Sequence, residues 1–238
     1  MDVQKKVIIA LDFPNSDKAF ALVDILGEKA KIYKVGSELF TSYGPGIVKE
    51  LRDKGKDVFL DLKFHDIPNT VGASAKVSTS LGVKIFNVHA SGGSEMMKKA
   101  KEESLKEAVK NGQAPPLVLG VTILTSLTSD MLVEELKILC SVDNQVIHLA
   151  KLAKDSGLDG VVCSPFEAKM IKEACGNDFI VLTPGIRPLW SVTDDQKRFK
   201  TPQDAITDGA DFLVIGRPVT KNEDPKGAFE KILDEINS

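Results

Sequence analysis

The stretch at residues 61–66, Asp-Leu-Lys-Phe-His-Asp, holds the side chains whose types and spacing could do chemistry. It follows directly on the apolar run at residues 58–60. Side chains alternate along a strand, so Asp61 and Lys63 point to one face and their apolar neighbours to the other. Burying a carboxylate and an ammonium there is costly unless they serve a purpose. With Asp66 close behind, this spacing would keep a lysine charged inside a pocket, as an enzyme that acts on anionic carbon needs.

Eight short apolar or β-branched runs alternate with amphipathic stretches along the chain. The runs predict strands over residues 7–12, 31–36, 57–64, 84–89, 117–124, 160–164, 179–183 and 212–216. The amphipathic stretches predict helices over residues 18–28, 46–54, 71–81, 95–110, 144–156, 167–174, 202–208 and 225–236. Eight such units predict an α/β fold of the (β/α)8 barrel type, with a doubly wound open sheet as the alternative. Since no linker or low-complexity tract interrupts them, we expect one domain over residues 1–238.

In a barrel of this type, functional residues lie at the carboxyl ends of the strands. The charged residues at or just after predicted strand ends are Asp12, Lys34, Asp61, Lys63 and Arg217. We expect the charges of the second and third strands, together with Asp66, to alternate in sign, so that each lysine is held protonated and each aspartate ionised. Two alternatives remain: the charges could form a structural ion-pair cluster, and Asp12 could cap a helix or lie on the rim.

Two loops near the end of the chain predict a phosphate site. Residues 183–187, Thr-Pro-Gly-Ile-Arg, close the seventh strand, and residues 215–218, Ile-Gly-Arg-Pro, close the eighth. Barrels often bind phosphate with these loops, through backbone amides and an arginine fork. The polar loop at residues 187–196 is longer than the usual connection and predicts a lid, with a surface insertion as the alternative. Trp190 in this loop could pack under the lid or face solvent.

Composition excludes several classes of protein. The 238 residues carry a net charge of −3, so no overall field favours nucleic acid or an anionic membrane. No apolar run is long enough to cross a bilayer, and the first residues lack the apolar core of a signal peptide. The three cysteines lack paired spacing, which indicates free thiols in a reducing cytoplasm, with Cys163 in the core.

The chain also lacks a glycine-rich nucleotide fingerprint, a Walker loop and a nucleophile elbow. Its three histidines, His65, His89 and His148, do not have the spacing of zinc ligands, so no metal site is expected. We expect His89 to be a hydrogen-bonded support for the charge cluster rather than a proton shuttle. The alternating charges at residues 101–110 predict a solvated helix face.

Read together, these segments resemble the orotidine 5'-monophosphate decarboxylase family in its bacterial form. The matching segments, in family order, are residues 10–12, 34–36, 61–70, 87–93, 124–126, 183–187 and 214–218. They span nearly the whole chain. The block at residues 61–70, Asp-Leu-Lys-Phe-His-Asp-Ile-Pro-Asn-Thr, is the most specific of them.

The resemblance implies a homodimeric barrel that converts orotidine 5'-monophosphate to uridine 5'-monophosphate and carbon dioxide without cofactor or metal. It implies that Lys63 donates a proton to C6 of the pyrimidine, and that Lys34, Asp61 and Asp66 complete the charge network. Asp66 and Thr70 would reach into the neighbouring subunit's site. The remaining substrate-binding residues that it implies are Asp12, Ile67, Thr125, Ser126, Pro184, Arg187, Gln196, Gly216 and Arg217.

Two other readings of the sequence remain. The sugar-phosphate branch of the same superfamily shares the Asp-x-Lys-x-x-Asp pattern but uses magnesium, held in part by a glutamate at the end of strand two. Lys34 occupies that position here, and its charge would repel a metal cation. A barrel that binds phosphate without catalysis is the other reading, disfavoured because a buried charge network is costly to keep without chemistry.

Overall fold

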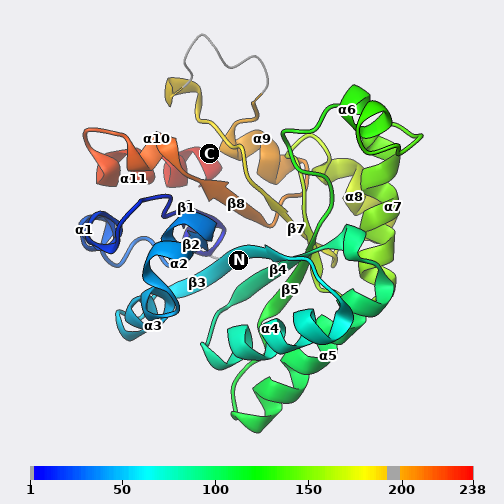
Figure 1. The fold of residues 1–238 in the computed structure, drawn as a ribbon. Coiled ribbons are helices and arrows are strands. Elements are labelled where there is room, and N and C mark those ends of the chain that lie inside the picture. The colour runs from blue at the N-terminus through cyan, green and yellow to red at the C-terminus, as the bar shows by residue number, and fades with distance from the viewer. Residues whose placement is uncertain (1–2, 192–198, 238) are drawn as a thin grey trace.

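The computed structural model describes residues 3–191 and 199–237. Eight parallel strands form a closed barrel in sequence order, which confirms the predicted (β/α)8 architecture (Figure 1). The strands are β1 (Val7–Ala10), β2 (Ile32–Gly36), β3 (Asp57–Phe64), β4 (Ile85–His89), β5 (Leu117–Val121), β6 (Gly160–Val162), β7 (Ile180–Thr183) and β8 (Phe212–Ile215).

Helices surround this barrel in chain order (Figure 1). The α-helices are α1 (Ser16–Leu26), α2 (Ser37–Tyr43), α3 (Gly46–Asp53), α4 (Pro68–Ser80), α5 (Ser94–Lys110), α6 (Ser129–Glu134), α7 (Val142–Asp155), α8 (Ala168–Cys175), α9 (Pro202–Thr207), α10 (Arg217–Thr220) and α11 (Pro225–Asn237). Three short 3-10 helices are η1 (Val3–Lys5), η2 (Ala90–Gly92) and η3 (Leu189–Ser191). No helix in these described ranges is long and apolar enough to span a membrane.

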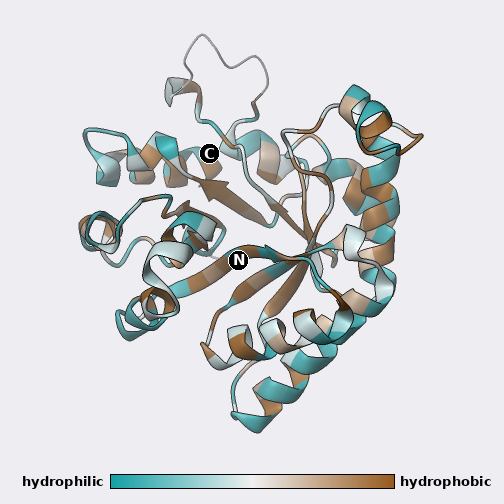
Figure 2. Ribbon diagram, viewed as in Figure 1, coloured by the Kyte–Doolittle hydropathy of each residue, from teal (hydrophilic) through white to brown (hydrophobic). Residues whose placement is uncertain are grey.

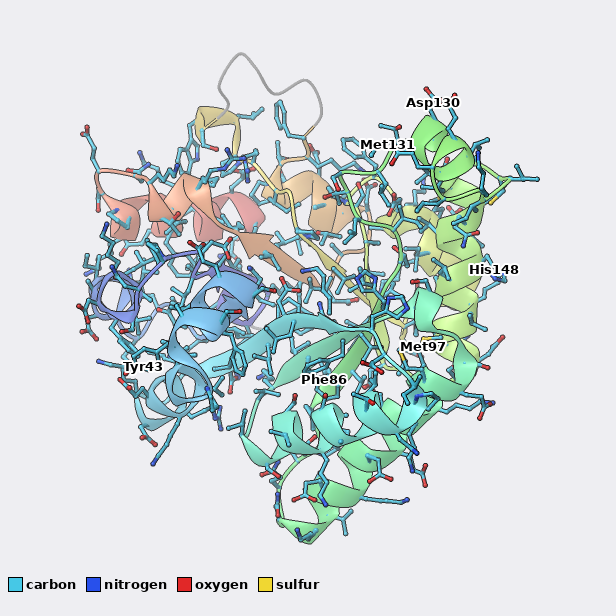
Figure 3. The ribbon with its side chains drawn as sticks, viewed as in Figure 1. Tyr43, Phe86, Met97, Asp130, Met131 and His148 are labelled. Atoms are coloured by element: carbon cyan, nitrogen blue, oxygen red, sulfur yellow. The ribbon has the colours of Figure 1, made fainter. Side chains whose placement is uncertain are left out.

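Two apolar layers hold the barrel together. Alternate strand residues such as Ile8, Phe59 and Leu182 fill its interior, while the intervening ones pack outward against the helices. Because most strand residues are buried on both faces of the sheet, the strands appear as largely hydrophobic segments at the centre of the molecule (Figure 2). Phe86 and Met97 belong to the outer layer and are fully buried, whereas His148 lies exposed on α7 at the periphery (Figure 3).

Local signals start the helices where the sequence predicts them. The Asn15 side chain accepts a hydrogen bond from the Lys18 amide at α1, and Thr201 caps α9 in the same way through the Asp204 amide. Helix α4 begins at Pro68 rather than at the predicted residue 71, because proline is favoured in the first turn, where its missing N–H has no partner to lose.

Several strands end earlier than predicted. β1 stops at Ala10, β5 at Val121 and β6 at Val162, each two or three residues short. The amides of Leu11, Thr122 and Cys163, just past these ends, still donate hydrogen bonds to carbonyl oxygens of the neighbouring strands. Beyond them the chain continues into the loops that form the mouth of the barrel.

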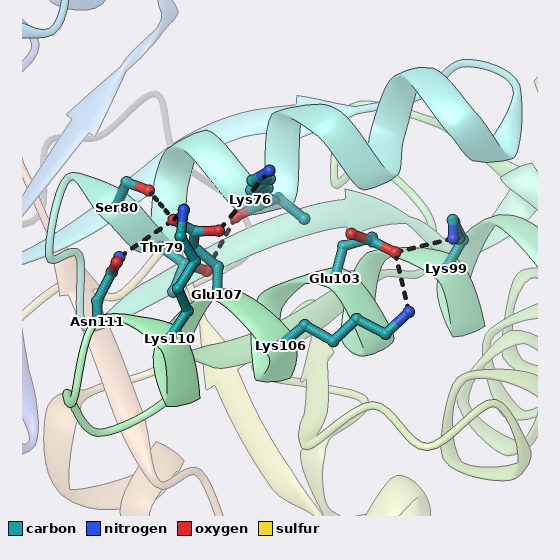
Figure 4. Close-up of polar contacts among 10 residues, drawn as sticks. Lys76, Thr79, Ser80, Lys99, Glu103, Lys106, Glu107, Lys110 and Asn111 are labelled. Carbon is teal, nitrogen blue, oxygen red and sulfur yellow. Dashed lines mark hydrogen bonds and ion pairs between the residues drawn. The ribbon is translucent and has the colours of Figure 1, made fainter.

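The stretch at residues 101–110 is more than the solvated face that the sequence predicts. α5 packs along α4, and Glu107 is only 5 % exposed between them, where it accepts hydrogen bonds from Ser80 and Asn111 (Figure 4). Ser104 is fully buried and bonds to Thr79. Polar residues of α4 therefore face α5, which the charge pattern of α5 alone does not reveal.

Candidate active site

The third strand carries Asp61 and Lys63, the residues predicted to be catalytic, on an irregular backbone. Leu60 pairs with Phe86, and the next registered pair is Phe64 with Val88. Four residues on β3 thus correspond to two on β4, which makes a bulge over residues 61–63. Lys63 within it has φ of 51°, a left-handed conformation that non-glycine residues rarely adopt. Such conformations cost free energy and are concentrated at functional sites.

Asp61 is the centre of the charge network. Its Oδ1 accepts hydrogen bonds from Lys63 Nζ at 2.6 Å and from Asn87 Nδ2 at 2.8 Å. Its Oδ2 lies 3.5 Å from Lys34 Nζ. Burial alone would raise the pKa of Asp61, but the two lysines and the hydrogen bonds from Lys63 and Asn87 outweigh it and lower the pKa below its usual value. The carboxylate is therefore ionised and pinned.

Lys34 extends the network to the first strand. Its Nζ donates to Asp12 Oδ1 at 2.7 Å, so the charges alternate from Asp12 through Lys34 and Asp61 to Lys63. Gly36 leaves room for this contact, since a Cβ there would lie 3.0 Å from Lys34 Nζ. The predicted alternation of charge is thus present in the structure of the single chain, without Asp66.

A cavity of about 390 Å³ opens at the carboxyl ends of the strands. Charged side chains of β1–β3 line one side, and apolar ones such as Val121, Val162 and Leu182 line the other. Arg187 and Arg217 reach it from the ends of β7 and β8. Burial, and next the positive charge of Arg217, lowers the pKa of Arg187, so two guanidinium groups are held together against their mutual repulsion. An anion between them would relieve that cost.

The cavity brings together most of the residues predicted to bind substrate: Asp12, Lys34, Asp61, Lys63, Thr125, Pro184, Arg187, Gly216 and Arg217. Four others, Asp66, Ile67, Thr70 and Ser126, are exposed and do not line it. Asp66 Oδ1 accepts a hydrogen bond from the Ile67 amide rather than from a lysine of the network. Gln196 lies outside the described residues. In the loop predicted to be a lid, Trp190 is 42 % exposed, with Lys231 Nζ 5.8 Å from its ring centroid.

The support that the sequence analysis predicts for His89 comes from another residue of β4, Asn87. Among the described residues, the His89 ring makes no hydrogen bond and instead lies 5.3 Å from the His65 ring, so the prediction that it supports the charge cluster is wrong. Burial, followed by the charges of His65 and Lys63, lowers the pKa of His89. Asn87, which sequence reasoning missed, makes the supporting contacts. A buried amide two residues before His89, inside an apolar strand, was the available signal.

Cys163 behaves as predicted. Its side chain is 1 % exposed in the outer layer, and burial, with the nearby charge of Glu167, raises the pKa of its thiol well above the usual value. Within residues 3–191 and 199–237, no group of three or more His, Cys, Asp or Glu side chains could hold a metal ion.

A parallel (β/α)8 barrel with an ammonium bonded to a carboxylate in its cavity and two arginines at the last strand ends has the features expected of a barrel enzyme. The chain matches the Orotidine 5'-phosphate decarboxylase / HUMPS family over residues 5–232, and it belongs to that family.

Relatives and solved structures agree with this assignment. The chain is 49% identical over 235 residues to an orotidine 5'-phosphate decarboxylase of Trichlorobacter lovleyi, covering 99% of this chain and 96% of the relative. It is 48% identical over 237 residues to one of Syntrophomonas wolfei, covering 99% of both chains. The crystal structure of orotidine 5'-phosphate decarboxylase from Lactobacillus acidophilus superposes with a TM-score of 0.88 at 42% identity, covering 98% of this chain and 99% of that chain.

Proposed function

We propose that this protein decarboxylates orotidine 5'-monophosphate to uridine 5'-monophosphate and carbon dioxide, in the cytoplasm, without a metal or organic cofactor. The observation that carries the proposal is the ammonium of Lys63, held 2.6 Å from the partly buried Asp61 carboxylate in a cavity that apolar side chains also line. Three free cysteines fit a reducing compartment.

Substrate binding begins at the phosphate. Arg187 and Arg217 supply guanidinium forks, and Gly216 offers its backbone at the end of β8. Gln196 would add a contact from the lid loop. Asp12 and Lys34 are placed to bind the ribose hydroxyls, and Thr125 with Ser126 the pyrimidine edge. Binding energy gained at the remote phosphate can be used in the chemical step, since it orients the ring and closes the site.

The chemical step breaks the bond between C6 and the carboxylate carbon. The electron pair stays on C6, carbon dioxide leaves, and the resulting carbanion has no π system in which to delocalise. The barrier must therefore fall mainly by electrostatic stabilisation. The Lys63 ammonium faces the developing negative charge and then transfers its proton to C6, which forms the new C–H bond; solvent returns a proton to the amine.

Asp61 fixes the position of this ammonium and would also lie near the departing carboxylate. Its lowered pKa keeps it ionised when substrate enters. Lys34, between Asp12 and Asp61, offsets part of that negative charge. The apolar side chains that line the cavity strengthen all of these interactions, because they lower the effective dielectric constant.

The magnesium-dependent sugar-phosphate branch is the alternative within the same superfamily. It would need a metal ligand where β2 places the Lys34 ammonium, 2.7 Å from Asp12 and 3.5 Å from Asp61. A cation fixed between the two carboxylates competes with a metal for both of them. This arrangement supports the metal-independent reaction.

We further propose that the active unit is a homodimer in which Asp66 and Thr70 complete the partner's site. Residues 65–70 are exposed as a continuous segment, and Ile67 and Val77 present 67 % and 59 % of their surface. Exposed apolar side chains beside polar residues of a predicted site favour an interface there. A mixture of Lys63→Ala and Asp66→Ala chains tests it: about a quarter of wild-type activity should return, because half of the dimers are hybrids with one complete site. A mixture as inactive as its components contradicts shared sites.

The activity itself is tested by incubating the protein with orotidine 5'-monophosphate and following loss of the orotate absorbance. We expect complete conversion, unaffected by a metal chelator. An unchanged spectrum with folded protein would point to a non-catalytic phosphate-binding barrel. Turnover that the chelator abolishes would favour the metal-dependent branch.

A further inference from the structure

Asn87 occupies the place where the ladder between β3 and β4 is interrupted. It lies between Phe86 and Val88, the two β4 residues whose partners on β3 are four positions apart. Its side chain is fully buried. A main-chain group of β4 cannot pair regularly with the bulged segment, so polar groups there need another partner.

The Asn87 amide supplies that partner on both sides of the bulge. Its Oδ1 accepts the Lys63 backbone N–H at 2.8 Å, and its Nδ2 donates to Asp61 Oδ1 at 2.8 Å. Only one orientation of the amide satisfies both groups. The reverse orientation would set a carbonyl oxygen against the carboxylate and an NH2 against an N–H.

From these contacts we infer that Asn87 is a positioning residue for the proposed decarboxylation. It holds the Asp61 carboxylate and the strained Lys63 backbone in fixed relative positions, so that the ammonium faces the cavity. The inference rests on the proposed function for its catalytic consequence. The geometry on which it depends belongs to the chain itself.

Two features explain why this amide controls the geometry of the site. Lys63 has φ of 51°, so its backbone needs a fixed hydrogen bond to hold a conformation that would otherwise relax. Asp61 Oδ1 receives both the Lys63 ammonium and the Asn87 amide, and the neutral amide limits rotation of the carboxylate without competing for its charge. Small displacements at such a site are costly, since the reacting atoms must align closely.

Titratable groups of three neighbouring strands lie near the amide. Asp61 and Lys63 contact it from β3, and Lys34 reaches Asp61 from β2. His89 ends β4, and its ring lies 5.3 Å from that of His65, which follows β3. Asn87→Asp keeps the shape and can still accept the Lys63 N–H. It removes the donor to Asp61 and places a second carboxylate beside it, which raises the pH at which the pair takes up a proton.

The test compares Asn87→Asp and Asn87→Ala with wild type, using Thr79→Val as the matched control. Thr79 is also buried and hydrogen-bonded, to Ala75 and Ser104, but it lies between α4 and α5. We expect both Asn87 variants to lose about 100-fold or more in kcat with KM changed less than about threefold. In Asn87→Asp the acid limb of the kcat profile should also move up by at least about one pH unit. Thr79→Val should lower Tm and leave kcat and the pH profile unchanged.

A structural role alone would lower Tm in all three variants and leave the pH profile of Asn87→Asp where it is in wild type; that result would overturn the inference. Carbon-13 NMR titration of Asp61 in ligand-free protein gives a readout that does not need turnover. A higher Asp61 midpoint in Asn87→Asp supports the positioning role even if wild type fails to convert orotidine 5'-monophosphate, which would contradict the proposed function alone. An unchanged midpoint contradicts the inference.

Discussion

The two ends of the barrel use the same residue types, aspartate and lysine, but leave them in different states. At the amino end, Lys172 Nζ donates to the carbonyl oxygens of Asn177 and Phe179 at 2.9 Å and to Asp211 at 2.7 Å. An ammonium has three protons, so this one is saturated. At the carboxyl end, Lys63 Nζ has one acceptor among the described residues, Asp61. Two of its protons are therefore left for a substrate or a partner subunit.

The carboxylates differ in the same way. Asp211 and Asp159 at the amino end each accept a backbone N–H of the neighbouring strand, from Val181 and Val118, in addition to a lysine. They satisfy backbone N–H groups near the amino ends of β7 and β5. Asp61 accepts no backbone N–H among the described residues and is held by side chains instead. Saturated pairs stabilise the fold, whereas the pair at the mouth leaves ammonium protons available for the proposed chemistry.

Lys63→Ala should give the largest effect on activity. Removing both the ammonium and the proton donor should lower kcat by about 10⁴-fold or more, since each contribution alone is worth at least about 100-fold. The fold should persist, because the Lys63 side chain is 34 % exposed and alanine keeps the backbone N–H that donates to Asn87. Steady-state kinetics and a thermal melt check both parts. A variant that keeps a tenth of wild-type turnover is incompatible with the role proposed for Lys63.

Arg217→Ala should have the next largest effect on activity. Loss of a charge-assisted contact to phosphate should raise KM for orotidine 5'-monophosphate by about 100-fold. Orotidine, which lacks the phosphate, should be affected little. The comparison of the two substrates is the measurement, and equal losses for both would remove the phosphate assignment.

Lys172→Ala sharpens the contrast from the other end of the barrel. It breaks a saturated pair that is 11 % exposed at the lysine and 33 % at Asp211, so the free energy of unfolding should fall by about 2 kcal/mol after allowance for solvent screening. Turnover per folded molecule should stay as in wild type. Urea unfolding measures the free energy, and an activity assay on the same sample measures turnover. A loss of kcat with unchanged stability would contradict the distinction between a structural pair at the amino end and a functional pair at the carboxyl end.

The pH dependence of wild type tests the state of Asp61. Its folded pKa lies below the unfolded value, so the stability that it contributes is present above the unfolded pKa and is lost as pH falls through the folded one. Activity that needs this carboxylate ionised should then show no acid limb from Asp61 above about pH 4, near the ordinary aspartate value. An acid limb of activity near pH 6 that disappears in Asp61→Asn would show that the pKa of Asp61 is not lowered by Lys34 and Lys63.

Glu107→Gln should give the smallest effect. Burial raises the pKa of Glu107, but hydrogen bonds from Ser80, Lys110 and Asn111 outweigh it and lower the pKa overall. The carboxylate therefore stabilises the α4–α5 contact at neutral pH, and this contribution disappears as pH falls through its folded pKa. The Tm of the variant should be slightly below that of wild type at pH 7 and equal to it at low pH. If variant and wild type have the same Tm at both pH values, the hydrogen bonds to Glu107 do not contribute to stability.

The sequence was sufficient to predict the barrel, because buried parallel strands leave an unmistakable alternation of apolar runs and amphipathic helices. It also placed Lys34, Asp61 and Lys63 at one rim, since strand ends follow from the same pattern. The short helices α2, α6 and α10 were missed because four to seven residues give too little periodicity to recognise.

The details of the site could not be predicted. The bulge at residues 61–63 depends on how β3 meets β4, a contact between segments more than 20 residues apart along the chain. The left-handed conformation of Lys63 and the bridging role of Asn87 follow from that bulge. The separation of Asp66 from Lys63 within one chain depends on the turn into α4, which spacing alone does not specify.

The most direct test of the mechanism is a crystal structure with bound uridine 5'-monophosphate, in which the distance from Lys63 Nζ to C6 of the pyrimidine is measured. We expect about 3–4 Å, with the phosphate between Arg187 and Arg217, because proton transfer to that carbon requires near contact. An ammonium turned away from the ring, with another group of the protein nearest to C6, would contradict the proposed role of Lys63.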